Sequence, residues 1–163
     1  MSSTVIKQML KIKIIVSVIC VLLLGYSIAM ANTIEDSDIK YFFLKANSFE
    51  PVLKGREVLY YRAEDREGNL LGVVFKTSGR SYEGEIETLV GMLKDGTITA
   101  IKVLTKDDTS GLGSLVSGPQ FTEQFKNTQD LSGIQAVTGA TVSSQAIIDS
   151  VKKKAAEIKG YIQ

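Results

Sequence analysis

A long uncharged apolar segment near the N-terminus, residues 14–31, restricts this chain more than any other feature of its sequence. At about 1.5 Å per residue, a helix over this segment is about 27 Å long, close to the ~30 Å hydrocarbon core of a bilayer. Basic residues precede it and acidic residues follow it, namely Lys7, Lys11 and Lys13 before and Glu35, Asp36 and Asp38 after. By the positive-inside rule we predict a single-pass cell-membrane anchor, with residues 1–13 in the cytoplasm and the remaining chain on the extracytoplasmic side.

A cleaved signal peptide is the competing interpretation of the same segment. Ala29, Met30 and Ala31 form an A-x-A pattern after a basic and an apolar region, as in secretory signals. The apolar run is longer than the ~7–15 residues usual for a signal core, which favours a retained anchor. The N-terminus of the mature protein would decide between the two.

Missing residue types exclude many kinds of chemistry. The 163 residues, enough for one domain beside the anchor, contain no histidine, no tryptophan and one cysteine, Cys20, which lies in the apolar segment. Cys/His zinc sites, cysteine-ligated iron–sulfur clusters, CxxCH haem attachment and Ser-His-Asp triads are therefore excluded from the rest of the chain, and we predict no metal site. The near balance of 19 basic and 18 acidic residues argues against nucleic-acid binding.

The residues after the anchor predict an α+β domain. Ile39, Phe42, Phe43 and Ala46 have helical spacing, so we expect a juxtamembrane helix that ends before Pro51 and packs on the domain; contact of its aromatic residues with lipid is the alternative. Beyond it, four β-prone runs separated by turn residues predict two hairpins of an antiparallel sheet. The expected strands are 57–63, 70–75, 84–92 and 97–104, and the expected later helices are 120–126, with Phe121 and Phe125 on one face, and 144–159.

Small and hydroxyl-bearing residues fill the turn before the last predicted helix, residues 136–144. Backbone N–H groups and the positive end of the helix dipole favour a phosphate at such a position. Gly139 and Ala140 would let the phosphate approach closely, and Thr141 would be accessible to a modifying enzyme. The alternative is that Ser143 or Ser144 only caps the helix.

The run Thr138-Gly139-Ala140-Thr141 resembles the S/T-G-A-T motif at which FMN is attached in a family of membrane-anchored flavoproteins. Residues 82–86, 95–103 and 108–113 resemble successive further blocks of the same FMN-binding domain, in the same order and with fitting spacing. With the anchor, the chain is similar to the G subunits of Rnf electron-transport complexes and, less closely, to the C subunits of sodium-translocating NADH:quinone reductases.

The resemblance implies a specific set of FMN-binding residues and no catalytic residue. It makes Thr141 the attachment point through a phosphoester, with Thr138, Gly139, Ala140 and Val142 around the phosphate. Thr109, Gly111, Leu112 and Gly113 would line the flavin ring, and Tyr82 and Glu85 are further candidates. The chain departs from the family pattern at two positions: Gln135 stands where an aspartate is usual, and Ser110 stands where proline is common.

The resemblance also implies a function. The chain would be an electron-carrying flavoprotein subunit of an ion-translocating membrane redox complex, with the other membrane subunits and a flavin transferase as partners. Residues 32–55 would form the juxtamembrane helix and linker, and residues 56–163 the FMN-binding domain. Because of Gln135, a flavin-free assembly or ligand-binding module of the same fold remains an alternative, as does a stand-alone membrane-anchored FMN protein.

Overall fold

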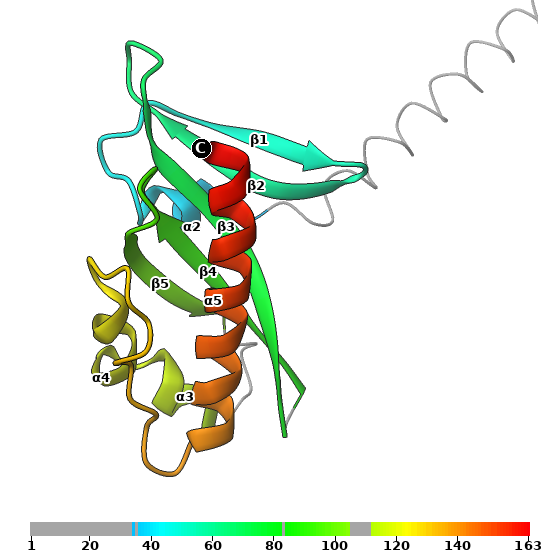
Figure 1. Cartoon of the computed structure of the whole chain (residues 1–163), viewed down its shortest axis with the longest axis vertical. Helices are drawn as coiled ribbons and strands as arrows, with labels where there is room; N and C mark the ends of the chain where they lie inside the picture. The colour runs from blue at the N-terminus through cyan, green and yellow to red at the C-terminus, as the bar shows by residue number, and fades with distance from the viewer. Residues whose placement is uncertain (1–33, 35, 83, 105–111) are drawn as a thin grey trace, which may run out of the picture. The chain divides into compact units, whose positions relative to one another are not determined.

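The structure, a computed structural model, describes residues 34, 36–82, 84–104 and 112–163 (Figure 1). The predicted anchor at residues 14–31 lies outside these ranges. Within them, no helix has both the length and the apolar character needed to cross a bilayer.

Five antiparallel strands form one sheet in the order of the sequence. They are β1 (Ser48–Lys54), β2 (Glu57–Glu64), β3 (Leu70–Ser81), β4 (Gly84–Met92) and β5 (Ile98–Leu104). The four predicted strands are confirmed, and β3 extends six residues beyond its predicted end at Phe75. Gly68 and Gly96 have φ of 81° and 94° in the hairpin turns, a conformation that glycine adopts without steric cost.

The sheet contains one strand more than the four that the sequence predicted, namely β1. The expected helix that ends before Pro51 is short: α2 covers only Asp36–Lys40, and Ala46 lies outside it. Pro51 instead lies within β1, paired with Tyr61. Because β1 is an edge strand with only β2 beside it, a proline without an N–H group is tolerated there.

The segment containing α2 packs on one face of the sheet. Ile39, Phe42 and Phe43 are all buried, so core packing is confirmed for these residues and lipid contact is wrong for them. Two glycines make room for the rings: a Cβ atom on Gly72 would lie 2.4 Å from Phe43, and one on Gly91 would lie 2.7 Å from Phe42.

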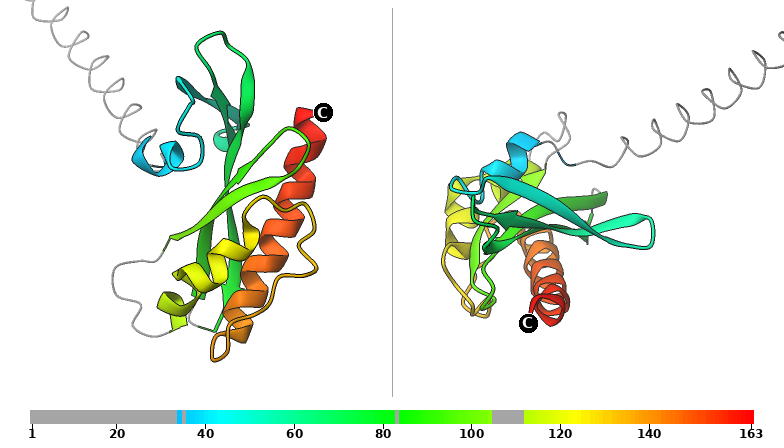
Figure 2. Two further views of the ribbon diagram at one scale, coloured as in Figure 1. Left: turned by 90° about the vertical axis from the view of Figure 1, so that its left-hand side faces the viewer. Right: turned by 90° about the horizontal axis from the view of Figure 1, so that it is seen from above.

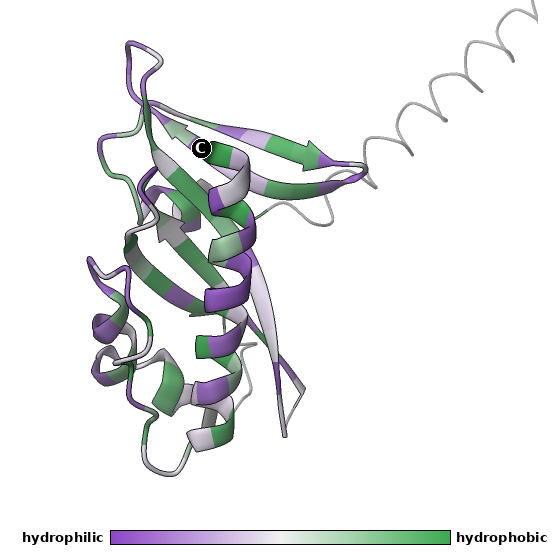
Figure 3. Ribbon diagram, viewed as in Figure 1, coloured by the Kyte–Doolittle hydropathy of each residue, from purple (hydrophilic) through white to green (hydrophobic). Residues whose placement is uncertain are grey.

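Helices pack on the opposite face of the sheet (Figures 1 and 2). They are α3 (Leu112–Ser117), α4 (Pro119–Thr122), the 3-10 turn η2 (Glu123–Phe125) and the long α5 (Thr141–Ile162). Phe121 and Phe125 share the core as predicted, with ring centroids 5.2 Å apart. Figure 3 shows apolar and polar positions alternating along α5, whose buried residues include Ile147, Val151 and Ile158.

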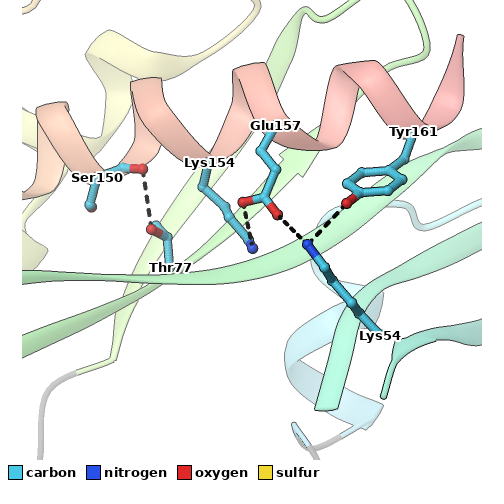
Figure 4. Close-up of polar contacts among 6 residues, drawn as sticks. All are labelled: Lys54, Thr77, Ser150, Lys154, Glu157 and Tyr161. Carbon is cyan, nitrogen blue, oxygen red and sulfur yellow. Dashed lines mark hydrogen bonds and ion pairs between the residues drawn. The ribbon is translucent and has the colours of Figure 1, made fainter. Parts of the chain in front are cut away.

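Helix α5 runs antiparallel to β3 and touches it closely. Thr77 Oγ1 donates a hydrogen bond of 3.2 Å to the Ser150 carbonyl (Figure 4), and a Cβ atom on Gly79 would lie only 2.3 Å from the Ala146 carbonyl oxygen. Successive β3 residues therefore lie beside successively earlier residues of α5. This alignment directs the β3–β4 turn toward the end of the sheet where α5 begins.

Candidate functional site

The sequence motif forms a tight turn immediately before α5. The Ala140 N–H donates a hydrogen bond of 3.0 Å to the Val137 carbonyl, which closes the turn, and Gly139 has φ of 86° within it. Ala140 is buried, whereas Thr138 and Gly139 are exposed. The turn thus presents two of its residues outward while Ala140 fixes it to the core.

Thr141 is the first residue of α5 and is exposed, as is Val142 after it. The N-cap is Ala140, whose side chain makes no capping hydrogen bond, and no acidic residue occupies the first turn. The positive end of the helix dipole is therefore compensated neither by a cap side chain nor by a carboxylate. An anion bound beside Thr141 would supply what the chain itself does not.

Ser144 has a different role from the capping considered above. Its fully buried hydroxyl accepts a hydrogen bond of 3.0 Å from the Val137 N–H and donates one of 2.9 Å to the Ala140 carbonyl. Neither Ser143 nor Ser144 is the N-cap, so the capping interpretation is wrong. Ser144 instead ties both ends of the turn to the first turn of α5.

The second predicted part of the site reaches the turn through α3. Thr109 and Gly111 lie outside the described residues, and Leu112 and Gly113 begin α3. Leu115 from the same helix lies beside the turn, since a Cβ atom on Gly139 would be 3.8 Å from its Cδ1 atom. Helix α3, which begins with Leu112 and Gly113, thus lies beside the motif at Leu115, although Gly113 and Thr138 are 25 positions apart in the sequence.

Tyr82 and Glu85, the further candidates, occupy different positions. Tyr82 lies in the β3–β4 turn and is 85% exposed. Glu85 pairs with Arg80 and accepts a hydrogen bond of 3.4 Å from the Ser78 hydroxyl. Ser78 and Arg80 alternate with Gly79, which faces α5, so Glu85 lies on the sheet face away from that helix. The described geometry does not bring Glu85 toward Thr141.

Gln135, where the family pattern has aspartate, is held through its backbone. Its N–H donates to Gln124 Oε1 at 2.8 Å, and Gln124 Nε2 donates to its carbonyl at 3.2 Å. The residue is exposed. The side chain at this position is therefore free to be read by another protein without any change in the fold.

A shallow pocket of about 290 Å³ lies elsewhere, between the β4–β5 turn and the C-terminal half of α5. It is lined by residues that include Met92, Gly96, Leu131 and Lys159, and by none of the predicted site residues. Thr138, Gly139 and Thr141 of the motif are instead exposed at the surface. In the described ranges, no group of three or more Cys, Asp or Glu side chains is arranged to hold a metal ion.

Sequence reasoning missed Leu115, and it named Ser144 only as a possible helix cap. A hydroxyl three residues after the motif threonine was visible, but its partners depend on the closed turn. Leu115 had no signal of its own, since only tertiary packing brings α3 to Gly139.

Comparison with known proteins finds similar sequences and similar folds. The model of the FMN-binding domain matches residues 81–156, from the end of β3 into α5. The chain is 35% identical over 130 residues to the G subunit of the ion-translocating oxidoreductase complex of Methanosarcina acetivorans, covering 69% of each protein. It is 34% identical over 112 residues to the G subunit of the Na(+)-translocating ferredoxin:NAD(+) oxidoreductase complex of Acetobacterium woodii, covering 60% of this chain and 54% of that one.

Two solved structures share the fold. The NqrC crystal structure from Shewanella oneidensis superposes with a TM-score of 0.51 at 17% identity, covering 78% of both chains. The C subunit of the Na(+)-translocating NADH-quinone reductase from Parabacteroides distasonis gives a TM-score of 0.53 at 14% identity, covering 80% of this chain and 86% of that one. At these identities the likeness concerns the fold alone.

Proposed function

This chain belongs to the FMN-binding domain family that includes the G subunits of ion-translocating oxidoreductase complexes, and on that premise we propose that it carries FMN covalently on Thr141. The bond would be a phosphoester between the Thr141 hydroxyl oxygen and the phosphorus of FMN. One observation supports this most strongly: Thr141 is exposed at the start of a 22-residue helix whose N-terminus has neither a side-chain cap nor an acidic residue.

The residues around Thr141 fit a phosphate. Gly139, with its positive φ and no side chain, leaves the backbone open to a close approach, and the uncompensated helix N-terminus favours the negative charge of a phosphodiester. Ser144 keeps the turn in shape from the buried side. Thr138, Ala140 and Val142 would complete the surroundings of the phosphate.

Apolar side chains beside the turn fit a flavin ring. Leu115 is 42% exposed and Val142 is 39% exposed, and each lies next to the motif without being covered by the core. The ring would also meet Thr109, Gly111, Leu112 and Gly113 of the preceding loop, and Tyr82 remains a candidate from the β3–β4 turn. When bound, FMN supplies electron transfer in steps of one or two electrons, and the protein contributes position and environment.

We further propose that the chain works as an electron-transfer subunit within an ion-translocating membrane complex. Its partners would be the other membrane subunits and a flavin transferase that modifies Thr141. Residues 14–31 would anchor it with residues 1–13 in the cytoplasm, so that the domain lies on the extracytoplasmic side. A covalent bond would suit that side of the membrane because FMN lost there is not replaced.

Coexpression with a flavin transferase tests the attachment. The full chain, denatured and separated on a gel, should give a band with flavin fluorescence, and Thr141→Val should abolish it. Ser132→Ala removes an exposed hydroxyl that lies outside the motif and should leave a fluorescent band. A dark wild-type band would favour the flavin-free module, and native flavin that is released on denaturation would favour reversible binding.

Gln135→Asp sharpens the same experiment. Because the backbone of Gln135 makes its hydrogen bonds with Gln124, an aspartate side chain fits there without disturbing the turn. We expect unchanged stability and faster flavin attachment, measured as band fluorescence against time of coexpression. Equal rates for the two proteins would show that the transferase does not read position 135.

A further inference from the structure

Two exposed apolar side chains stand between exposed lysines just after α2. Tyr41 is 52% exposed and Leu44 is 89% exposed, and Lys40 and Lys45 flank them. We call these four residues the basic–apolar patch. Isolated exposed leucines are ordinary, but an aromatic and a leucine framed by cations within six residues form a recognisable surface.

The backbone holds this patch in place. Phe42 and Phe43 point into the sheet, where Gly91 and Gly72 leave room for their rings. The Phe42 N–H donates to the Ile39 carbonyl at 3.1 Å, and the Ala46 N–H donates to the Phe43 carbonyl at 3.0 Å. With the two phenylalanines buried, the residues on either side of them face outward. The exposure of Tyr41 and Leu44 is thus fixed by packing.

The patch carries two exposed cations, Lys40 and Lys45. Neither Lys40 nor Lys45 forms an ion pair with any residue that the structure describes. Two acids whose side chains the structure describes are paired with other lysines: Asp38 with Lys102 and Glu123 with Lys126, each at 2.5 Å. The lysines of the patch are therefore available to an anionic partner.

We propose that the basic–apolar patch rests on the headgroup region of a bilayer containing anionic phospholipid. Tyrosine and leucine inserted at the interface beside lysines that meet lipid phosphates are typical of interfacial segments. The inference rests on the anchor in the proposed function. Only residues 32–35 separate the predicted span from Asp36, and four residues reach at most about 14 Å. So short a connection keeps the start of α2 close to the lipid surface.

The contact would orient the domain. The α2 segment covers one face of the sheet, and α5 covers the other (Figure 2). With the patch on lipid, the face that carries α5 and Thr141 would turn away from the bilayer. The flavin would then be presented to protein partners and not to acyl chains.

Tryptophan fluorescence tests the contact directly, because the natural chain contains no tryptophan. The full chain with Leu44→Trp is reconstituted into vesicles of phosphatidylglycerol and phosphatidylcholine, with bromine atoms on the shallow acyl positions in one set. We expect blue-shifted emission and strong quenching in the brominated set. Tyr82→Trp, in the exposed β3–β4 turn, is the matched control and should show neither effect.

Lysine variants and vesicle flotation separate the possible outcomes. Lys40→Gln together with Lys45→Gln should reduce the quenching of Trp at position 44, and removing phosphatidylglycerol should do the same. If the protein floats with vesicles but Leu44→Trp resembles Tyr82→Trp, the patch proposal fails while the anchor stands. If the protein does not float, anchor and patch fail together, whereas flavin attachment is unaffected. Shielding of the tryptophan only in the presence of other subunits would contradict lipid as the partner.

Discussion

The two ends of helix α5 are built in opposite ways. At its C-terminal end, Lys54 of β1 donates a hydrogen bond of 3.1 Å to the Tyr161 hydroxyl and lies 3.7 Å from Glu157, which also pairs with Lys154 at 3.0 Å (Figure 4). At its N-terminal end, Thr141 is exposed and no side chain caps the helix. Polar side chains hold the C-terminal end of α5 to β1, whereas no side chain caps its N-terminal end, which we call the open end.

This difference shows that the fold does not need Thr141 to hold α5, so the N-terminus of the helix can serve as a binding site. The contacts of Thr77 and Gly79 with α5, together with its C-terminal ties, hold the helix without any contribution from Thr141. The unsatisfied N–H groups at the open end can then be completed by a ligand. Variants at the two ends, and at the contact between them, should therefore behave differently.

The largest expected effect lies at the contact between β3 and α5. Gly79→Ala places a Cβ atom 2.3 Å from the Ala146 carbonyl oxygen. This oxygen belongs to the helix backbone, so no side-chain rotation can relieve the clash. We expect a loss of about 3 kcal/mol in the free energy of unfolding, measured with urea. Gly133→Ala, with no atom within 4 Å of its new Cβ, is the control and should be nearly neutral. A neutral Gly79→Ala would mean that α5 is not seated as described.

Ser144→Ala should have the next largest effect, and it acts at the open end. It removes the acceptor of the Val137 N–H and the second donor to the Ala140 carbonyl, at an expected cost of about 2 kcal/mol. Flavin attachment should also fall because the turn loses its shape. Ser143→Ala is matched in type and burial but lacks such bonds, so it should change little. Equal unfolding midpoints for the two variants would refute the role given to Ser144.

Glycine-to-alanine changes at the two ends should differ in sign. Gly139→Ala has space for its Cβ but keeps a φ of 86°, which an alanine resists by about 1 kcal/mol. Gly160→Ala lies inside the helix in open space and should stabilise the fold by about 0.5 kcal/mol. Thermal unfolding of both variants measures the signs. A stabilising Gly139→Ala would contradict the positive φ.

The smallest expected effect on stability comes from Glu157, near the C-terminal end of α5, and it depends on pH. The pKa of Glu157 lies below its ordinary value of 4.5, chiefly through the hydrogen bond from Lys154 and then through the charges of Lys154 and Lys54. A lowered carboxylate pKa stabilises the fold above that ordinary value, and the contribution disappears as the pH falls through the folded-state pKa. The wild type should exceed Glu157→Gln slightly in stability at neutral pH and lose this advantage in acid. A difference that does not change with pH would contradict the ion pairs.

The sequence predicted correctly those helices and turns that depend on residues close together in the chain. Phe121 and Phe125 share a face because their spacing is helical, and the turn at Gly96 forms because the Asp-Gly pair permits it. Strand β1 escaped prediction because its interior proline reads as a strand breaker unless the strand is known to be an edge. Helix α5 begins at Thr141, three residues before the predicted start, and no cap residue marks that boundary.

Long-range contacts in the site were beyond sequence reasoning. The motif residues were predicted as a group through the family resemblance, but the closeness of Leu115 to Gly139 depends on how α3 packs. Glu85 was grouped with them through the same resemblance, and only the alternation of β3 and β4 places it on the face away from α5.

Intact-mass analysis of the chain purified from its native membranes tests the central claim most directly. We predict a single species heavier than the polypeptide by FMN less one water, with the added mass on the peptide that contains Thr141. An unmodified peptide at this position, in protein that is otherwise folded and assembled, would contradict the account.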